Sequence, residues 1–234
     1  LGYCRFPVFV QCTRKLAERS FKQFKGFWEK NPLLAEDFPE ICHPVKCLNG
    51  APSRAAQQHV GGISTEIAWT ADSIRFPKIP VECRPPGAID YGGVALMYFG
   101  LDSAIRGVND EGERPTFVLI DDPETPDVAA NDEQNGKVEI MIDSDIAGLG
   151  APDRRLARMV LTTIQNEHCY SARVTNPKIK PSWDGKRYAM LQVWPDCWNT
   201  DESSGLTQHW HEYIKLRQKD QSSGDRYGLT ATAY

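Results

Sequence analysis

The 234-residue sequence lacks any run close to the roughly 18 consecutive apolar residues that a membrane-spanning helix needs, so we expect no such helix. Its seven cysteines are odd in number and widely spaced, which excludes the dense, even pattern of a small disulfide-stapled domain. Cys42, His43 and Cys47 are followed by no second pair of close ligands at finger-like spacing, which argues against a structural zinc site. Reduced thiols in an intracellular protein fit this cysteine usage best.

The sequence also lacks a complete G-x-x-x-x-G-K-[ST] phosphate-binding motif. Its two Gly-Lys pairs, at 136–137 and 185–186, are followed by Val and by Arg. Taken alone, this absence argues against nucleotide hydrolysis. The chain opens on Leu1 rather than Met, within what reads as a continuing α/β pattern. We therefore expect a truncated chain whose phosphate-binding loop precedes Leu1.

Apolar residues are plentiful enough for a core, at 41% of the chain, and the net charge is −4. Residues 5–12 form a short apolar run that predicts a strand. Thr13 then opens a segment with apolar residues at helical spacing, namely Ala17, Phe21, Phe24 and Trp28. The other face of this predicted helix is basic, with Arg14, Lys15, Arg19, Lys22, Lys25 and Lys30. Such a face could contact nucleic-acid phosphates or could simply be solvated.

Three continuous apolar runs follow, at 94–99, 116–120 and 159–161, and each ends in glycine or polar residues. Runs of this kind are typical of strands buried on both faces of a parallel sheet. Between the second and third runs, Thr125 and Pro126 indicate the start of a helix. Residues 31–84 are rich in Pro and Gly and contain an alternating, hairpin-like stretch near 63–69 with a turn at 70–73. The sequence predicts an α/β fold with a mostly parallel sheet.

Two acids, Asp121 and Asp122, stand directly after the apolar run FVLI. In P-loop nucleoside triphosphatases this is the Walker B arrangement, in which one carboxylate holds the Mg²⁺ shell and the next acid polarises the attacking water. The same residues could form an ordinary acidic turn. They could also belong to a two-metal nuclease site that uses the acids at 121–124 with Asp143 or Asp145, although neighbouring strand residues point to opposite faces.

A set of motifs in a fixed order resembles the large terminase subunit of tailed bacteriophages. These motifs are PLLAEDFPEI (32–41), GLDSAIRG (100–107), GERPTFVLIDDPET (112–125), Gln134 in the next predicted helix, IAGLGAP (146–152), MVLTTIQN (159–166) and WDGKRYAML (183–191). The resemblance runs from about residue 5 to the end of the chain. It implies a DNA-packaging motor whose three-layer, helicase-like P-loop ATPase domain precedes an RNase H-like nuclease domain.

The resemblance also assigns roles to individual residues. Asp121 matches the Mg²⁺-associated acid and Asp122 the catalytic acid, where many members of the family carry Glu. Because Asp is shorter, Glu124 is a second candidate for the catalytic acid. Arg106 matches an arginine near the nucleotide, suited to sensing the γ-phosphate or contacting the DNA backbone. The remaining candidates for nucleotide contacts are Thr162 and Thr163, which match a coupling motif, and Gln134.

By the same resemblance, residues 1–170 would be an incomplete ATPase core without its Walker A motif. Residues 171–234 would be a small linker subdomain leading toward a nuclease domain beyond Tyr234. The expected cofactors are ATP and Mg²⁺, and this chain alone would be inactive. The expected partners are double-stranded DNA, a portal protein, a small terminase subunit and further copies in a homo-oligomeric ring, in the cytoplasm of the infected bacterium and away from any membrane. The non-enzymatic alternative is a DNA- or portal-binding adaptor with a degenerate NTPase fold.

Overall fold

The computed structural model describes residues 4–53, 57–88, 90, 92–103, 105–189 and 205–224. The chain divides into two compact units, Leu1–Gly185 and Lys186–Tyr234. The first unit therefore includes residues 171–185, which the sequence analysis grouped with the second. Within the described residues, every helix is too short or too polar to cross a bilayer.

A six-stranded sheet forms the centre of the first unit, with the order β4-β5-β6-β1-β7-β8. The strands β1 (Pro7–Gln11), β6 (Ala95–Gly100), β7 (Phe117–Asp121) and β8 (Ala157–Leu161) are parallel. The strands β5 (Ser73–Arg75) and β4 (Ala68–Trp69) extend the sheet in antiparallel fashion beyond β6. The predicted α/β fold with a mostly parallel sheet is confirmed.

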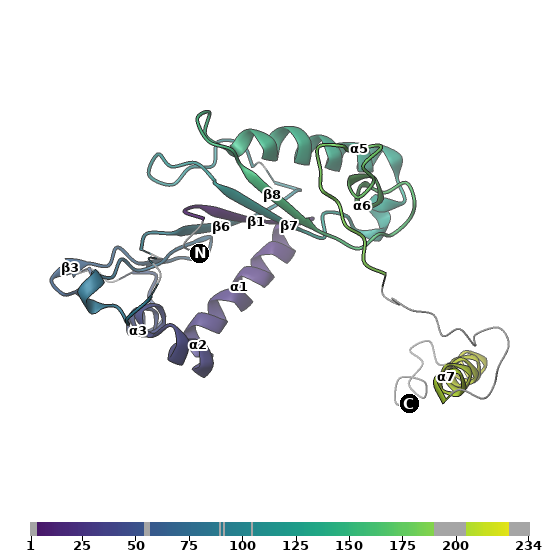
Figure 1. Cartoon of the computed structure of the whole chain (residues 1–234), viewed down its shortest axis with the longest axis horizontal. Helices are drawn as coiled ribbons and strands as arrows, with labels where there is room; N and C mark the ends of the chain where they lie inside the picture. The colour runs from purple at the N-terminus through teal and green to yellow at the C-terminus, as the bar shows by residue number, and fades with distance from the viewer. Residues whose placement is uncertain are drawn as a thin grey trace. The chain divides into compact units, whose positions relative to one another are not determined.

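Helix α1 (Arg14–Lys30) lies on one side of the sheet (Figure 1). It begins at Thr13, whose side chain accepts a hydrogen bond from the backbone N–H of Leu16. Its apolar stripe buries Ala17, Phe21 and Trp28 as predicted. The short helices α2 (Pro32–Asp37) and α3 (Pro39–Leu48) follow, and α3 adds its apolar side chains to the same core cluster.

The opposite side of the sheet carries α5 (Asp132–Ile140) and α6 (Tyr170–Val174), as Figure 1 shows. Between β7 and β8 the chain forms α4 (Pro126–Ala129), α5, the π-helix η2 (Met141–Ile146) and the 3₁₀ turn η3 (Ala147–Leu149). The Thr125 side chain caps α4, as the sequence predicts. The inward side chains of the parallel strands pack with these helices in one core cluster. Helices on both sides of the sheet are compatible with the predicted three-layer fold.

The hairpin-like stretch near 63–69 contributes to two separate strand pairs. Strands β2 (His59–Val60) and β3 (Ile63–Ser64) form a small sheet of their own, whereas β4 and β5 pair across the predicted turn at Thr70. A 3₁₀ turn, η1 (Val81–Cys83), follows. The second unit contains α7 (Gly205–Ser222). Residues 188–194, whose sequence also suggests a strand, lie mostly outside the described residues.

Candidate functional site

The carboxyl ends of the four parallel strands form one edge of the sheet. At this edge Gln11 of β1 is in register with Gly100 of β6 and with Asp121 of β7. Asp121 is in turn in register with Leu161 of β8. Ligands of open α/β sheets bind beside the carboxyl ends of the strands, so we take this edge, the acid edge, as the candidate site.

The Asp121 carboxylate is held by its neighbour strand. Gln11 Nε2 donates a hydrogen bond of 2.8 Å to Asp121 Oδ2, and Ser20 Oγ of α1 donates one of 3.0 Å to Gln11 Oε1. This chain of contacts fixes the direction of one carboxylate oxygen from both β1 and α1. Neither Gln11 nor Ser20 is among the site residues predicted from the sequence. The available signal was Gln11 itself, the polar residue that ends an otherwise apolar strand.

Asp122 follows the end of β7 in an unusual backbone conformation. Its φ is +42°, in the left-handed region that non-glycine residues seldom adopt, and its side chain is exposed. Its backbone N–H donates to the carbonyl of Leu161 at 2.9 Å, which joins the ends of β7 and β8. Burial raises the pKa of the Cys12 thiol, and the charges of Asp122 and Asp102 raise it further. The Asp122 charge therefore acts at the end of β1 as well.

Glu124 does not extend the acid edge. Its side chain is buried, with 5% of the residue exposed, and it accepts hydrogen bonds from the backbone N–H groups of Tyr170 and Ser171, both at 2.8 Å. The Ser171 hydroxyl donates a third bond of 2.5 Å. Glu124 is the second candidate for the catalytic acid predicted from the sequence. The structure instead uses both of its carboxylate oxygens at the N-terminus of α6.

The two threonines of the coupling motif have different surroundings. Thr162, partly buried, directly follows β8, and its hydroxyl lies 2.5 Å from that of Ser171. Thr163 is exposed. Both follow the strand next to β7, so the structure brings them to the same sheet edge as Asp121 and Asp122.

Arg106 and Gln134 are placed differently. Arg106 lies in the segment that returns from the end of β6 to the start of β7, and its guanidinium binds Asp145 of η2 at 2.7 Å with the side chain 81% exposed. Gln134 is an exposed residue of the first turn of α5, where its N–H donates to Asn131 Oδ1. No described contact joins either residue to Asp121 or Asp122.

The acids named for the nuclease alternative are separated by their contacts. Asp143 binds Lys180 at 2.6 Å, Asp145 binds Arg106, and Glu124 binds the end of α6. Across the part of the chain that the structure describes, no three His, Cys, Asp or Glu side chains gather closely enough to hold a metal ion on their own. The described geometry therefore lends the two-metal arrangement no support.

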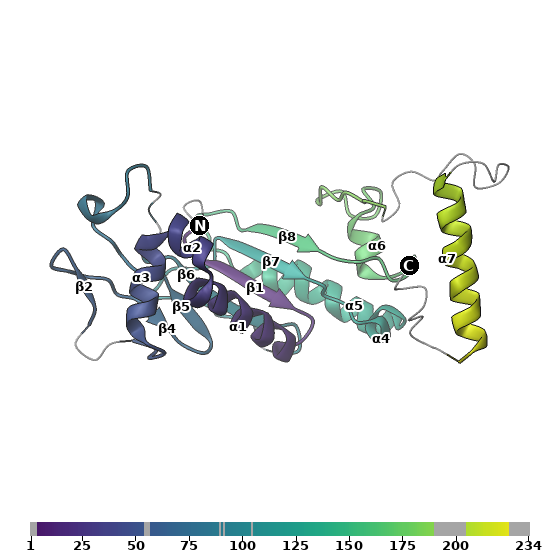
Figure 2. The ribbon, with the colours of Figure 1, turned by 90° about the horizontal axis from the view of Figure 1, so that it is seen from below.

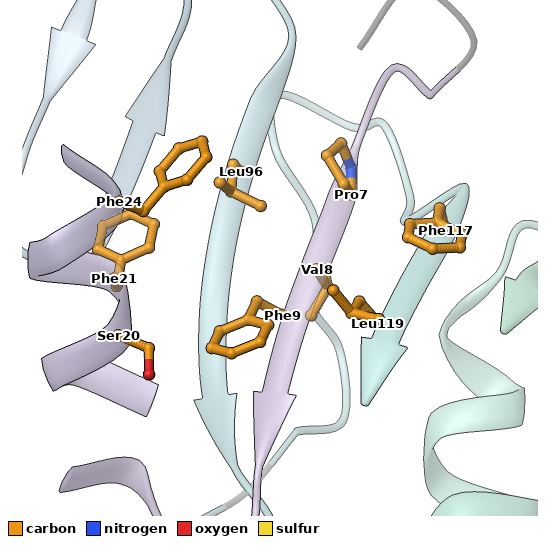
Figure 3. Close-up of a pocket in the computed structure, with 9 residues that line it drawn as sticks. All are labelled: Pro7, Val8, Phe9, Ser20, Phe21, Phe24, Leu96, Phe117 and Leu119. Atoms are coloured by element: carbon orange, nitrogen blue, oxygen red, sulfur yellow. The ribbon is translucent and has the colours of Figure 1, made fainter. Parts of the chain in front are cut away.

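The α1 side of the sheet carries an apolar groove of about 360 Å³. Figure 3 shows α1 and β6 on one side of it, β1 in the middle and β7 on the other. Its lining residues are Pro7, Val8, Phe9, Ser20, Phe21, Phe24, Leu96, Phe117 and Leu119. Figure 2, seen from the α1 side, shows β7 and β8 in view beyond α1. The groove therefore adjoins the strands that carry the acid edge.

Side-chain exposure on this face increases toward β8. Phe9 is in register with Tyr98 of β6, which is only 4% exposed, and with Leu119 of β7, which is half-buried. Leu119 is in register with Met159 of β8, which is 48% exposed, and Leu161 is 45% exposed. A parallel sheet is normally covered on both faces. In the described part of the chain, the α1 side of β7 and β8 remains open.

No protein-family model matches this sequence, and no curated protein matches it.

Proposed function

We propose that the chain is part of the ATP-hydrolysing core of a motor of the large-terminase type, which moves double-stranded DNA into a capsid. One observation carries the proposal. Asp121 and Asp122 stand at the carboxyl end of a parallel strand, next to a second strand end that orients Asp121 through Gln11. This is the sheet edge at which phosphates and their Mg²⁺ bind in P-loop nucleoside triphosphatases.

The donor set at the acid edge suits Mg²⁺. This ion prefers oxygen ligands and commonly binds through one or two carboxylates together with waters and substrate phosphates. Asp121 offers a carboxylate that Gln11 orients through Oδ2. Asp121 would therefore hold the ion shell, and the bound ion would neutralise charge on the phosphates of ATP.

Asp122 is the proposed general base. Its carboxylate is exposed beside Asp121, and its left-handed backbone turns the chain at the end of β7. A carboxylate within hydrogen-bond reach of a water orients that water and accepts its proton. Thr163, exposed at the neighbouring strand end, is the better placed threonine for contact with a γ-phosphate, because the Thr162 hydroxyl is engaged with Ser171.

The phosphate-binding loop belongs, in this proposal, to a strand–helix unit beside β8. Two observations support that position. β8 is one of the two edge strands of the described sheet, and the α1 side of β7 and β8 is open. A strand paired in parallel with β8 and followed by a helix over this face would put the N-terminus of the helix at the acid edge, where it favours phosphate binding.

The proposed DNA contacts use the exposed basic face of α1. Lys15 and Arg19 are exposed, whereas Arg14 binds Asp72 at 3.0 Å and Lys22 binds Glu18 at 2.5 Å. Exposed lysines and arginines supply the sequence-independent attraction to DNA phosphates. Arg106 remains a proposed sensor of phosphate or DNA, and it would first have to leave Asp145. A portal protein, a small terminase subunit and a ring of copies complete the proposed assembly.

The proposal predicts a difference between two forms of the protein. The 234-residue chain should show no ATP turnover, since its sequence contains no loop that grips the β- and γ-phosphates. The protein expressed from the natural start of its gene should turn over ATP with Mg²⁺. Steady-state phosphate release by both forms measures this. Turnover by a clean preparation of the 234-residue chain would contradict the proposed origin of the phosphate-binding loop, and silence of both forms would favour the adaptor alternative.

A further inference from the structure

Glu124 is a buried carboxylate whose described partners are hydrogen-bond donors of α6. It accepts three bonds, from the N–H of Tyr170, the N–H of Ser171 and the Ser171 hydroxyl. Within the described residues it forms no ion pair with Lys, Arg or His at 4.0 Å or less. Burial of a charged carboxylate is unfavourable unless hydrogen bonds compensate for the lost water, so these three bonds hold Glu124 firmly.

Other side chains meet at the same end of α6. The Thr162 hydroxyl at the end of β8 lies 2.5 Å from the Ser171 hydroxyl, and Asn135 of α5 accepts a bond of 3.1 Å from the Tyr170 N–H. We call Glu124, Asn135, Thr162 and Ser171 the α6 cap. Through it, the segments that follow β7 and β8 are fixed to one short helix.

The α6 cap lies two residues from Asp122. Only Pro123, which is buried and whose ring restricts its φ, separates Asp122 from Glu124. Asp122 itself has a φ of +42°. Asp adopts this region more readily than most non-glycine residues, but a single fixed conformation there still depends on neighbouring contacts, and the fixed position of Glu124 is one such restraint. The bond from the Asp122 N–H to the Leu161 carbonyl is another.

We propose that Glu124 is a positioning residue: by anchoring to α6, it holds Asp122 in its left-handed conformation and so sets the direction of the Asp122 carboxylate. The proposal rests on the proposed function for its catalytic meaning, but the anchoring can be tested without any ATP turnover. A carboxylate rather than an amide is required, because both oxygens accept hydrogen bonds, Oε1 from the Tyr170 N–H and Oε2 from the Ser171 N–H and hydroxyl, and an amide NH₂ group cannot accept one.

The test is site-resolved amide hydrogen exchange on the chain with Glu124→Gln. We expect the amides of Tyr170, Ser171 and Asp122 to exchange at least about tenfold faster, since charge-assisted bonds are lost and local opening becomes easier. Amides of central β1, such as Val10, should be unchanged. The matched control is Glu139→Gln. Glu139 binds Arg173 of α6 at 2.6 Å, so its loss perturbs α6 without touching the Asp122 loop.

Faster exchange at Tyr170 and Ser171 with unchanged exchange at Asp122 would overturn the proposal, because Glu124 would then cap α6 alone. Unchanged exchange at all three amides would overturn it as well. If Glu124→Gln does not fold, Ser171→Ala serves as the milder variant, because it removes the hydroxyl and keeps the carboxylate. For this variant, exchange is measured at the same three amides and judged by the same criteria.

A second readout separates positioning from simple stabilisation. In the natural-length protein, Glu124→Gln should lower kcat for ATP about tenfold or more, while the KM for ATP changes less than about twofold, because Asp122 acts on the chemical step. If kcat is unchanged and kcat/KM falls only because KM rises, the positioning role is contradicted. If the exchange results are as expected but the natural-length protein never turns over ATP, the proposed function is contradicted. The anchoring of Asp122 by Glu124 would still be supported.

Discussion

Replacing Asp122 with asparagine is expected to lower ATP turnover by the natural-length protein about a hundredfold, a typical loss for a positioned acid or base. Asparagine tolerates the left-handed region, so the φ of +42° is retained while the carboxylate is lost. The free energy of unfolding should stay within about 0.5 kcal/mol of the wild-type value. Steady-state turnover and urea unfolding measure the two quantities.

Asp122→Gly tests whether the backbone conformation at this position lowers the stability of the protein. Glycine adopts positive φ without a Cβ penalty, so this variant should be more stable by about 1 kcal/mol while its turnover is as low as that of Asp122→Asn. Gain in stability with loss of activity is the behaviour of a strained functional residue. If Asp122→Asn keeps more than about a tenth of the turnover, Asp122 is not the general base.

Replacing Gly100 with alanine is expected to destabilise the first unit by about 3 kcal/mol or more. Gly100 ends β6 against the start of α1, where an added Cβ would lie 1.9 Å from the backbone nitrogen of Arg14 and 2.4 Å from the carbonyl carbon of Thr13. These are backbone atoms, so relief requires a shift of the α1 N-terminus. The same shift would break the bond from the Arg14 N–H to Asp102 Oδ1 at 2.7 Å. Urea unfolding followed by circular dichroism measures the loss.

The matched control is Gly136→Ala. Gly136 lies inside α5, and in the described part of the chain nothing beyond its own helix backbone and adjacent residues lies within 4 Å of the Cβ that alanine would add. Alanine there should stabilise the protein by about 0.5–1 kcal/mol through its higher helix propensity. A Gly100→Ala variant as stable as the wild type would mean that α1 does not start as closely against β6 as described.

The sheet was predictable because its parallel strands coincide with continuous apolar runs in the sequence. The apolar runs at 94–99 and 116–120 correspond to β6 and β7 with shifts of one residue at most, and the Thr13 cap marks the start of α1. β8 begins two residues before its predicted start. Its second residue, Arg158, interrupts the apolar pattern. The Arg158 guanidinium is accommodated in the strand because it donates a hydrogen bond to the Ile142 carbonyl and lies over the Trp183 ring. Such tertiary contacts leave no local pattern.

The acid edge was predictable in part for the same reason. Asp121 and Asp122 end an apolar run, so their place at the carboxyl end of a strand follows from local sequence. The partner of Asp121, Gln11, lies 110 residues away, and the partners of Glu124 lie 46 and 47 residues away. Only the fold brings these residues together. Glu124 therefore looked like a third member of an acidic cluster, whereas it is an anchor for α6.

The most direct test of the central claim, that the acid edge is the ATP site, is turnover by the natural-length protein carrying Asp121→Ala. The matched control is Asp127→Ala, which removes an exposed carboxylate six residues further along, in the first turn of α4. We predict that Asp121→Ala lowers Mg²⁺-dependent turnover about a hundredfold or more and that Asp127→Ala changes it less than about twofold. Equal turnover by the wild type and Asp121→Ala would contradict the account and make the acids at the end of β7 structural.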